Sequence, residues 1–196
     1  FISEDDIEQA ILQKLEGDPF QYGILRCDPS PDKRELLPDG TGRSSKKECV
    51  LPLILREALA RLNPDIPGEK LEEIARDLCR DFSATDMTAT NYKYYNQIRN
   101  GIKISLRRNG KEDFDFVKLV DFDRPENNTF TAVSQMWIQG RVYWRRPDVL
   151  IFINGLPMVF VELKNSIVKV EEAYNDNLKN YLRDIPNLFA FNQICV

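Results

Sequence analysis

The chain has 196 residues, of which 42% are hydrophobic and 30% are charged, with a formal net charge of −4. This length and composition predict a single domain with a full hydrophobic core, and the lack of a long apolar run predicts a soluble, cytoplasmic protein with no membrane partner. Because the chain contains no histidine, sites built on Ser-His-Asp, Cys-His or histidine–metal chemistry are excluded.

The first half of the chain, residues 1–100, is expected to be helical with loops. Ser3 can cap a first helix that runs to about Leu15, with Asp6 in the capping-box position. Residues 28–48 are polar and contain proline and glycine, which predicts a mobile loop. Further helices are expected near 50–62, 69–82 and 91–100, the last one ending at Gly101.

The loop contains a glycine-rich run, Gly40 to Lys47, that invites comparison with phosphate-binding loops. It lacks the glycine that such loops carry directly before the lysine. Any nucleotide, ATP included, should therefore bind outside this chain.

The second half, residues 101–196, is expected to hold the catalytic sheet. Strands are predicted near 102–107, 114–121, 129–138, 149–153 and 158–164, followed by a helix near 170–184 and a terminal strand over 189–196. The chain starts without methionine and ends inside that last strand, so we expect a fragment of a longer protein. The predicted fold is α/β, with a mixed central β-sheet flanked by helices.

Charged side chains stand at the ends of the two most apolar strands. Asp148 precedes one strand, and Glu162 and Lys164 end the other. Residues two apart on a strand share a face, so Glu162 and Lys164 point together while Leu163 points into the core. Asp148 and Glu162 provide the oxygen ligands that Mg²⁺ prefers, and Lys164 could position a water or neutralise a phosphate.

The connection between these strands tests the arrangement. A strict two-residue turn at Asn154-Gly155 would pair Asp148 with Val161 and turn it away from Glu162, since a one-residue shift flips the face. We therefore predict a three- or five-residue connection or a β-bulge, and Pro157 fits such an irregularity. The alternative is that Glu162 and Lys164 form an exposed ion pair and Asp148 is a turn residue.

A longer string around these residues carries a family resemblance. Residues 146–165 read RPDVLIFINGLPMVFVELKN, and further matches are LNP at 62–64, DF at 121–122, PENN at 125–128, LKNY at 178–181 and IPNLF at 185–189. The chain closely resembles the N-terminal nuclease domain of the restriction (R, motor) subunit of type I restriction-modification enzymes, which belongs to the PD-(D/E)xK nuclease superfamily. The match spreads over nearly the whole chain.

The resemblance implies specific roles for residues of this chain. It implies metal ligation by Asp148 and Glu162, catalysis by Lys164 and a water contact by Glu8 on the first helix. Relatives often carry Gln-x-x-x-Tyr after the lysine strand, and the matching positions here, Asn177 and Tyr181, replace the glutamine by asparagine. The alternatives are that Glu8 is a solvated helix residue and that Tyr181 lines the core.

The negative net charge argues mildly against DNA binding, so contact with phosphates would rely on local basic patches. The candidate residues are Lys103, Arg107, Arg108, Arg141, Arg145 and Arg146. Each could equally be solvated surface.

The expected function is that of a Mg²⁺-dependent endonuclease domain acting on duplex DNA. The resemblance implies that an ATP-dependent translocase follows in the chain and that the modification and specificity subunits are its partners. The alternatives are a related DNA repair or processing nuclease and a non-catalytic docking module for the modification subunits. A pure docking surface would have no need of Asp148, Glu162 and Lys164 together.

Overall fold

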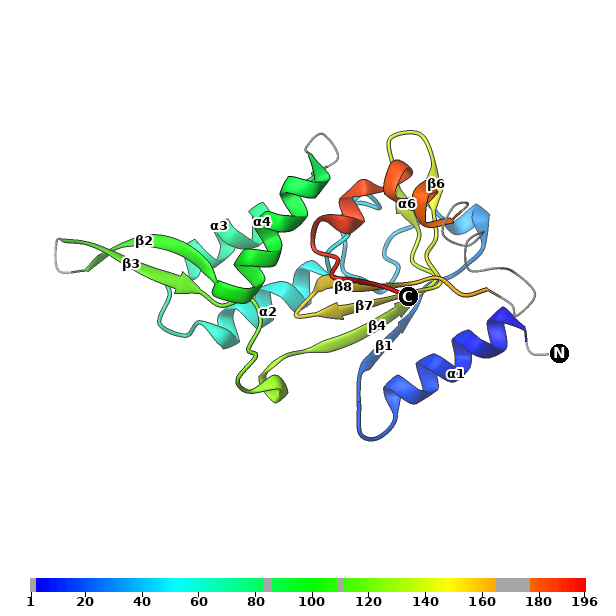
Figure 1. The fold of residues 1–196 in the computed structure, drawn as a ribbon, viewed down its shortest axis with the longest axis horizontal. Helices are drawn as coiled ribbons and strands as arrows, with labels where there is room; N and C mark the ends of the chain where they lie inside the picture. Colours follow the sequence, from blue (N-terminus) through cyan, green and yellow to red (C-terminus); the bar gives the residue numbers. More distant parts are fainter. Residues whose placement is uncertain (1–2, 83–85, 109–110, 165–176) are drawn as a thin grey trace.

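The computed structural model describes residues 3–82, 86–108, 111–164 and 177–196, and it has a five-stranded mixed sheet with helices on both faces (Figure 1). The strand order is β1-β4-β7-β8-β9, with parallel pairs at the two edges and antiparallel pairs in the centre. These strands are β1 (Gly23–Arg26), β4 (Phe130–Ser134), β7 (Val149–Ile153), β8 (Leu156–Val161) and β9 (Ile194–Cys195). The expected α/β architecture is confirmed.

The helices lie near their predicted ranges. The α-helices are α1 (Glu4–Glu16), α2 (Pro52–Leu62), α3 (Gly68–Leu78), α4 (Met87–Asn100) and α6 (Lys179–Asp184), and the short 3-10 helices are η1 (Pro31–Lys33), η2 (Pro125–Asn127) and η4 (Pro186–Ala190). Ser3 and Asp6 form the expected capping box, and α4 ends at Gly101 with a φ of 82°. No helix in these described ranges is long and apolar enough to cross a membrane. Part of the predicted helix near 170–184 lies outside the described residues.

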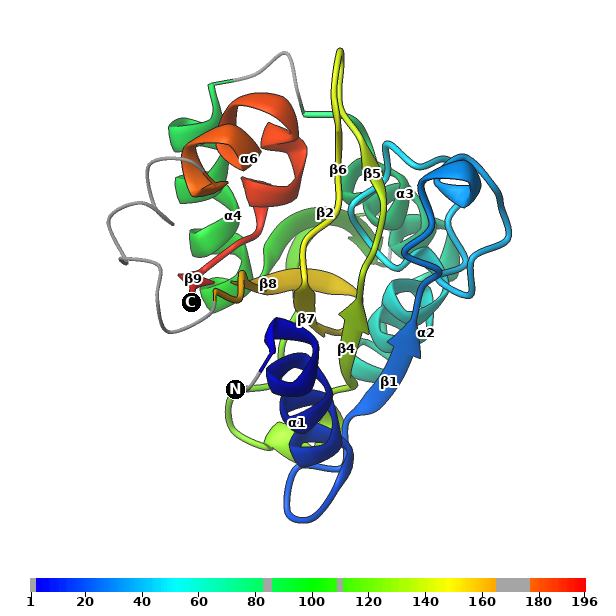
Figure 2. The same ribbon diagram turned by 90° about the vertical axis from the view of Figure 1, so that its right-hand side faces the viewer.

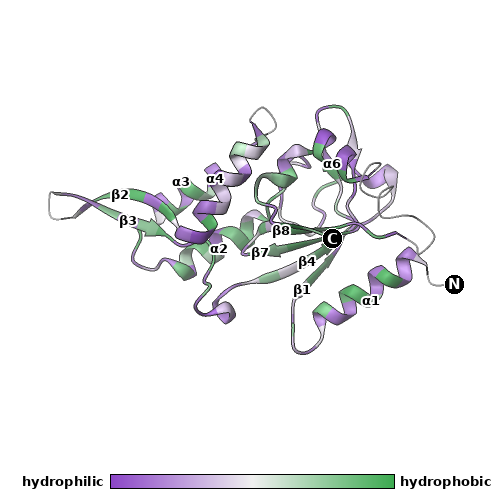
Figure 3. Cartoon of the chain, viewed as in Figure 1, coloured by the Kyte–Doolittle hydropathy of each residue, from purple (hydrophilic) through white to green (hydrophobic). Residues whose placement is uncertain are grey.

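Side chains alternate between the two faces of the sheet. Helix α1 covers one face, where Leu12 packs with Ala132 and Val149 (Figures 1 and 2). On the other face, Phe152 and Phe160 belong to a cluster that the segment of α6 and η4 completes. The central strands β7 and β8 are the apolar strands of Figure 3, as expected for strands covered on both faces.

The hairpin of β2 (Ile102–Arg108) and β3 (Lys111–Val117) does not join the main sheet. Its two strands pair with each other, and it projects from the molecule beside α3 and α4 (Figure 1). The prediction that both strands belong to the central sheet was wrong. The apolar face of β2 packs instead on the core of α2, α3 and α4, because Ile102, Ile104 and Leu106 all contact that cluster.

The hairpin of β7 and β8 contains the predicted bulge. Asn154 and Gly155 form a two-residue turn with φ values of 52° and 82°. The register then shifts between Ile151 and Phe152, so that Met158 is the extra residue and Val149 pairs with Val161. The predicted irregularity next to Pro157 is confirmed.

Several other elements differ from the prediction. Strand β1 was not predicted, the predicted strand 129–138 breaks after Ser134, and the predicted terminal strand 189–196 begins inside the 3-10 helix η4 and is a strand only over β9. The break leads to β5 (Ile138–Gln139), which pairs with β6 (Trp144–Arg145) as a separate ribbon. The break coincides with Gln135, whose φ of 57° is incompatible with a continuing strand.

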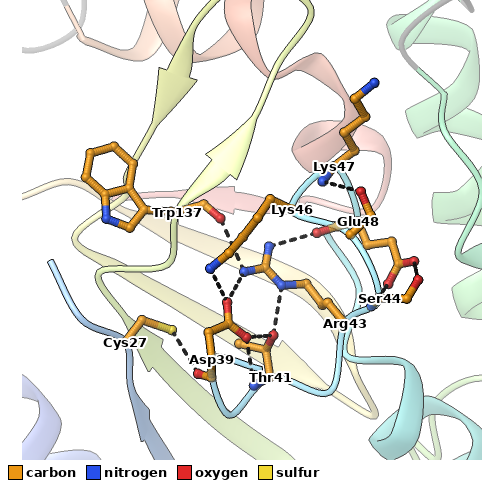
Figure 4. Close-up of polar contacts among 10 residues, drawn as sticks. Cys27, Asp39, Thr41, Arg43, Ser44, Lys46, Lys47, Glu48 and Trp137 are labelled. Atoms are coloured by element: carbon orange, nitrogen blue, oxygen red, sulfur yellow. Dashed lines mark hydrogen bonds and ion pairs between the residues drawn. The ribbon is translucent and has the colours of Figure 1, made fainter. Parts of the chain in front are cut away.

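The polar segment 28–48, expected as a mobile loop, contains a buried ion cluster (Figure 4). The carboxylate of Asp39 accepts from Arg43 Nη2 at 2.6 Å and from Lys46 Nζ at 2.7 Å, and the Arg43 side chain is fully buried. Arg43 also donates to the carbonyls of Glu48 and Trp137. These bonds fasten the loop to the start of β5, a constraint that its polar composition did not reveal.

Candidate active site

The two predicted carboxylates lie on adjacent strands at one end of the sheet. Continuing the β7–β8 register by one residue beyond Val149 and Val161 sets Asp148 opposite Glu162. The backbone N–H of Leu163 donates to Asp148 Oδ2 at 2.6 Å, and Leu163 itself packs toward the α1 side of the sheet. The bulge shifts the register by one residue, so the side chains of Asp148 and Glu162 point to the same face of the sheet.

Glu162 is held by two donors on one of its oxygens. Its Oε1 accepts from Lys164 Nζ at 3.1 Å and from Asn177 Nδ2 at 2.7 Å. Lys164 also donates to the Leu163 carbonyl at 2.8 Å. The second oxygen, Glu162 Oε2, is buried and has no hydrogen-bond partner among the described residues.

The electrostatics of the pair favour an added cation. Burial raises the pKa of Asp148, although the Leu163 N–H and the Lys164 charge oppose the shift. Burial also raises the pKa of Glu162, and the nearby charge of Asp148 adds to the effect. Both ionised carboxylates are thus destabilised by desolvation, Glu162 also by the charge of Asp148, and a bound cation would relieve both effects.

The donor set fits Mg²⁺. Within the ranges that the structure describes, no group of three or more acidic or cysteine side chains gathers closely enough to hold a metal ion. Mg²⁺ usually needs only one or two carboxylates, because it keeps several waters. Asp148 and Glu162 supply these, and Glu162 Oε2, which lacks a partner in the described part of the chain, is an oxygen atom suited to such an ion.

Asn177 and Tyr181, which were expected on one helix face, both reach this region. The contact from Asn177 to Glu162 shows that the shorter amide spans the distance. Tyr181 places its ring against Phe160, with centroids 5.0 Å apart, while its hydroxyl donates to the Arg146 carbonyl at 3.0 Å. The core interpretation of Tyr181 is therefore correct for its ring, and its hydroxyl contacts the segment that leads into Asp148.

Glu8 on α1 is buried, with 5% of its surface exposed, so the alternative of a solvated residue is wrong. Its Oε2 accepts a hydrogen bond from Gln135 Nε2. Burial raises the pKa of Glu8, opposed by the Gln135 hydrogen bond, and the charge of Asp148 also acts on it. No sequence pattern pointed to Gln135, because only its position opposite Asp148 in the folded sheet connects it to the site.

The candidate DNA-binding residues do not form one patch. Lys103 and Arg107 are exposed on the hairpin β2–β3, which projects from the end of the molecule opposite α1 and the ends of β7 and β8 (Figure 1). The side chain of Arg108 lies outside the described part of the chain. Arg141 lines a separate cavity of about 200 Å³ beside α6.

Two arginines precede Asp148 in the chain by three and two residues, and both have partners. Arg145 is paired with the buried Asp184 of α6. Arg146 donates to the Pro29 carbonyl and stacks over the Trp137 ring, with its guanidinium carbon 5.1 Å from the ring centroid. Among the candidates whose side chains the structure describes, Arg146 is the one that lies two residues before Asp148 and donates to a surface acceptor. That acceptor is the carbonyl of the exposed Pro29, which a phosphate could replace.

Comparisons with known proteins give a consistent result over the whole chain. Residues 1–196 match the family model described as the type I restriction enzyme R protein N terminus. The chain is 31% identical over its full length to the type I restriction enzyme HindI endonuclease subunit of Haemophilus influenzae and 30% identical, over 97% of its length, to the putative type I restriction enzyme MjaIXP endonuclease subunit of Methanocaldococcus jannaschii. The matched region spans 18% of each relative. A shorter match, 31% identical over 48% of the chain, is to the SauCOLORF180P endonuclease subunit of Staphylococcus aureus.

Proposed function

The chain belongs to the family of the type I restriction enzyme R protein N terminus, and from this premise we propose that it is a Mg²⁺-dependent nuclease domain that hydrolyses phosphodiester bonds of duplex DNA. The observation that carries the proposal is the convergence of Asp148, Glu162 and Lys164, with one buried oxygen of Glu162 lacking a partner among the described residues. An exposed ion pair, the alternative for Glu162 and Lys164, does not account for that buried oxygen.

Each side chain has a distinct proposed task. Asp148 and Glu162 would hold Mg²⁺, which when bound polarises a phosphate oxygen and lowers the pKa of its waters. Asn177 fixes the orientation of Glu162, and the Leu163 N–H fixes that of Asp148. Lys164 keeps its ammonium beside Glu162, where it can orient an attacking water or neutralise charge that develops on the phosphate.

The activity of the whole protein extends beyond this domain. Since the chain spans 18% of the two longest matches, we propose that an ATP-driven translocase follows it in the cytoplasmic protein. The modification and specificity subunits of the restriction complex are the proposed partners, and cleavage would follow translocation. Arg146, two residues before Asp148, is the proposed contact to a DNA phosphate near the site.

The test uses the full-length subunit reconstituted with its partner subunits. Wild type and Lys164→Ala are compared for plasmid cleavage and ATP hydrolysis in Mg²⁺. The matched control is Lys70→Ala, because Lys70 is an exposed lysine of α3 that pairs with Glu73 far from the carboxylates. We expect Lys164→Ala to lose cleavage and keep ATP hydrolysis, and Lys70→Ala to keep both.

Other outcomes distinguish the alternatives. Cleavage that survives in Lys164→Ala would contradict the proposed site and favour the docking module. Wild-type cleavage that needs neither ATP nor the specificity subunit would favour a repair or processing nuclease.

A further inference from the structure

Gln135 occupies an unusual backbone position directly beside the candidate site. It follows β4 with a φ of 57°, and its N–H donates to the carbonyl of Asp148 at 3.0 Å. Left-handed backbone is unfavourable for a residue with a Cβ atom and persists where the surrounding structure requires it. The chain thus keeps a glutamine where glycine or asparagine would fit the backbone better.

The left-handed backbone has a consequence for the side chain. Strict alternation along β4 would put Gln135 on the face of Val133, whereas Glu8 belongs to α1 on the opposite face. The break at Gln135 ends the alternation, and its side chain reaches Glu8 Oε2. The same side chain also acts against the burial-driven rise in the pKa of Asp148.

The remaining polar atom of this side chain is also informative. Gln135 Oε1 is buried and has no hydrogen-bond partner among the described residues. A buried carbonyl oxygen without a partner is costly, so such an atom commonly accepts from a water or a ligand. Gln135 and Glu162, which each carry such an oxygen, are the neighbours of Asp148 on its two sides across the end of the sheet.

We propose that Gln135 is a positioning residue of the nuclease site, which holds Glu8 through its side-chain amide and Asp148 through its backbone N–H, and which offers Oε1 to a water of the bound metal. This inference rests on the proposed function. A neutral amide suits the task, because it donates to carboxylates without adding a positive charge that would compete with the metal ion. A lysine would add that charge, and a glutamate could not donate.

Substitution by glycine separates this role from a purely structural one. Gln135→Gly removes the amide and at the same time relieves the left-handed strain, so the fold should be as stable as wild type or more stable. The matched control is Gln21→Gly. Gln21 is also a glutamine in left-handed conformation, with a φ of 51°, but its side chain is exposed and bonds to Asp18.

The measurements use the full-length subunit with its partners. The first is the Mg²⁺ concentration that gives half-maximal plasmid cleavage. The second is Ca²⁺ binding by calorimetry, from which the heat measured with Asp148→Asn is subtracted to remove binding at other sites. For Gln135→Gly we expect an unchanged or higher Tm, together with a loss of about 10–100-fold in metal affinity and in cleavage. Gln21→Gly should leave both unchanged.

The inference and the proposed function can fail separately. Normal cleavage and normal Ca²⁺ binding in Gln135→Gly would overturn the inference, while a simultaneous loss of cleavage in Lys164→Ala would leave the proposed function standing. If Gln135→Gly lowers the Tm, Gln135→Met gives the same comparison with the side-chain length kept and without an added charge near the metal ion. Wild-type metal affinity in that variant would also overturn the inference.

Discussion

The amide nitrogen of Asn177 lies 2.7 Å from Oε1 of Glu162 and fixes the orientation of that carboxylate from the segment that leads into α6. The family resemblance implies a glutamine at this position, and the asparagine amide here does reach the carboxylate. The amide and the carboxylate are therefore expected to act as one unit.

Replacing the Asn177 amide by an acid should remove the bond that orients Glu162 and so impair cleavage. Asn177→Asp removes the donor and puts a second carboxylate against Glu162, so cleavage should fall by about 10–100-fold. Asn177→Gln keeps the amide and should retain most activity. Plasmid cleavage by the reconstituted complex measures both, and equal activity in Asn177→Asp and wild type would show that the contact is dispensable.

Neutralising Asp148 should stabilise the metal-free chain. The pKa of Asp148 is raised by burial, so its ionised form is destabilised in the folded state at neutral pH. Asp148→Asn removes that cost and still accepts from the Leu163 N–H, and the Tm should rise by about 2–4 °C for each kcal/mol of relief. Because a raised carboxyl pKa destabilises the fold only above the unfolded pKa of about 3.9, the gain should shrink as the pH falls through the folded pKa and vanish near the unfolded one. Thermal unfolding in EDTA at pH 7 and pH 4 checks this, and a lower Tm for the variant at pH 7 would contradict it.

Removing the carboxylate of the buried ion cluster should destabilise the fold strongly. Asp39→Asn leaves Arg43 and Lys46 buried without their counterion, at a cost of about 3–5 kcal/mol. Burial alone would raise the pKa of Asp39, but bonds from Lys46 and Thr41 and the charge of Arg43 outweigh it, and the pKa lies below its ordinary value. The contribution is therefore present above the unfolded pKa of about 3.9 and is lost as the pH falls further.

Urea unfolding at pH 7 and pH 3 measures this contribution. The matched control is Asp28→Asn, because Asp28 forms an exposed pair with Lys33 and its loss should change the Tm little. Similar unfolding midpoints for the two variants at pH 7 would show that the cluster is not a stabilising element.

The turn of the β7–β8 hairpin should tolerate only glycine at position 155. Gly155 has a φ of 82°, and a Cβ atom there would lie 2.6 Å from the Leu51 carbonyl oxygen and 2.8 Å from the Leu55 nitrogen. Gly155→Ala should therefore cost about 2–5 kcal/mol, from the left-handed backbone and the clash together. Gly40 has the same φ, and a Cβ atom there would meet nothing within 4 Å, so Gly40→Ala isolates the backbone cost of about 1–2 kcal/mol. Equal losses of unfolding free energy in the two variants would rule out the clash with α2.

The sequence predicted the α/β architecture and the positions of the main candidate residues, while the chemical roles of those residues stay predictions. Asp148, Glu162 and Lys164 could be identified because charges at the ends of apolar strands are unusual, and the bulge followed from the need to place the two acids on one face. Asn177 followed from the family pattern. Gln135 could not be predicted, since its role depends on a left-handed backbone and on the packing of α1 against the sheet.

The errors in the fold have a common physical origin. Strand pattern identified β2 and β3 but could not say which partners they pair with, because an amphipathic hairpin can pack on helices as well as extend a sheet. The loop of residues 28–48 has the composition of a solvated segment, yet Arg43 and Lys46 are buried there because the carboxylate of Asp39 pairs with both. Both outcomes are decided by tertiary contacts that no local pattern contains.

The order in which the site's parts occur along the chain limits when it can be completed. Glu8 lies in the first helix and Asn177 lies after the last long strand, while Asp148 and Glu162 belong to one hairpin between them. During synthesis on the ribosome, a nascent chain that has made only the hairpin lacks the residue that orients Glu162. A chain truncated before Asn177 would therefore keep Asp148 and Glu162 but lack the amide that orients Glu162.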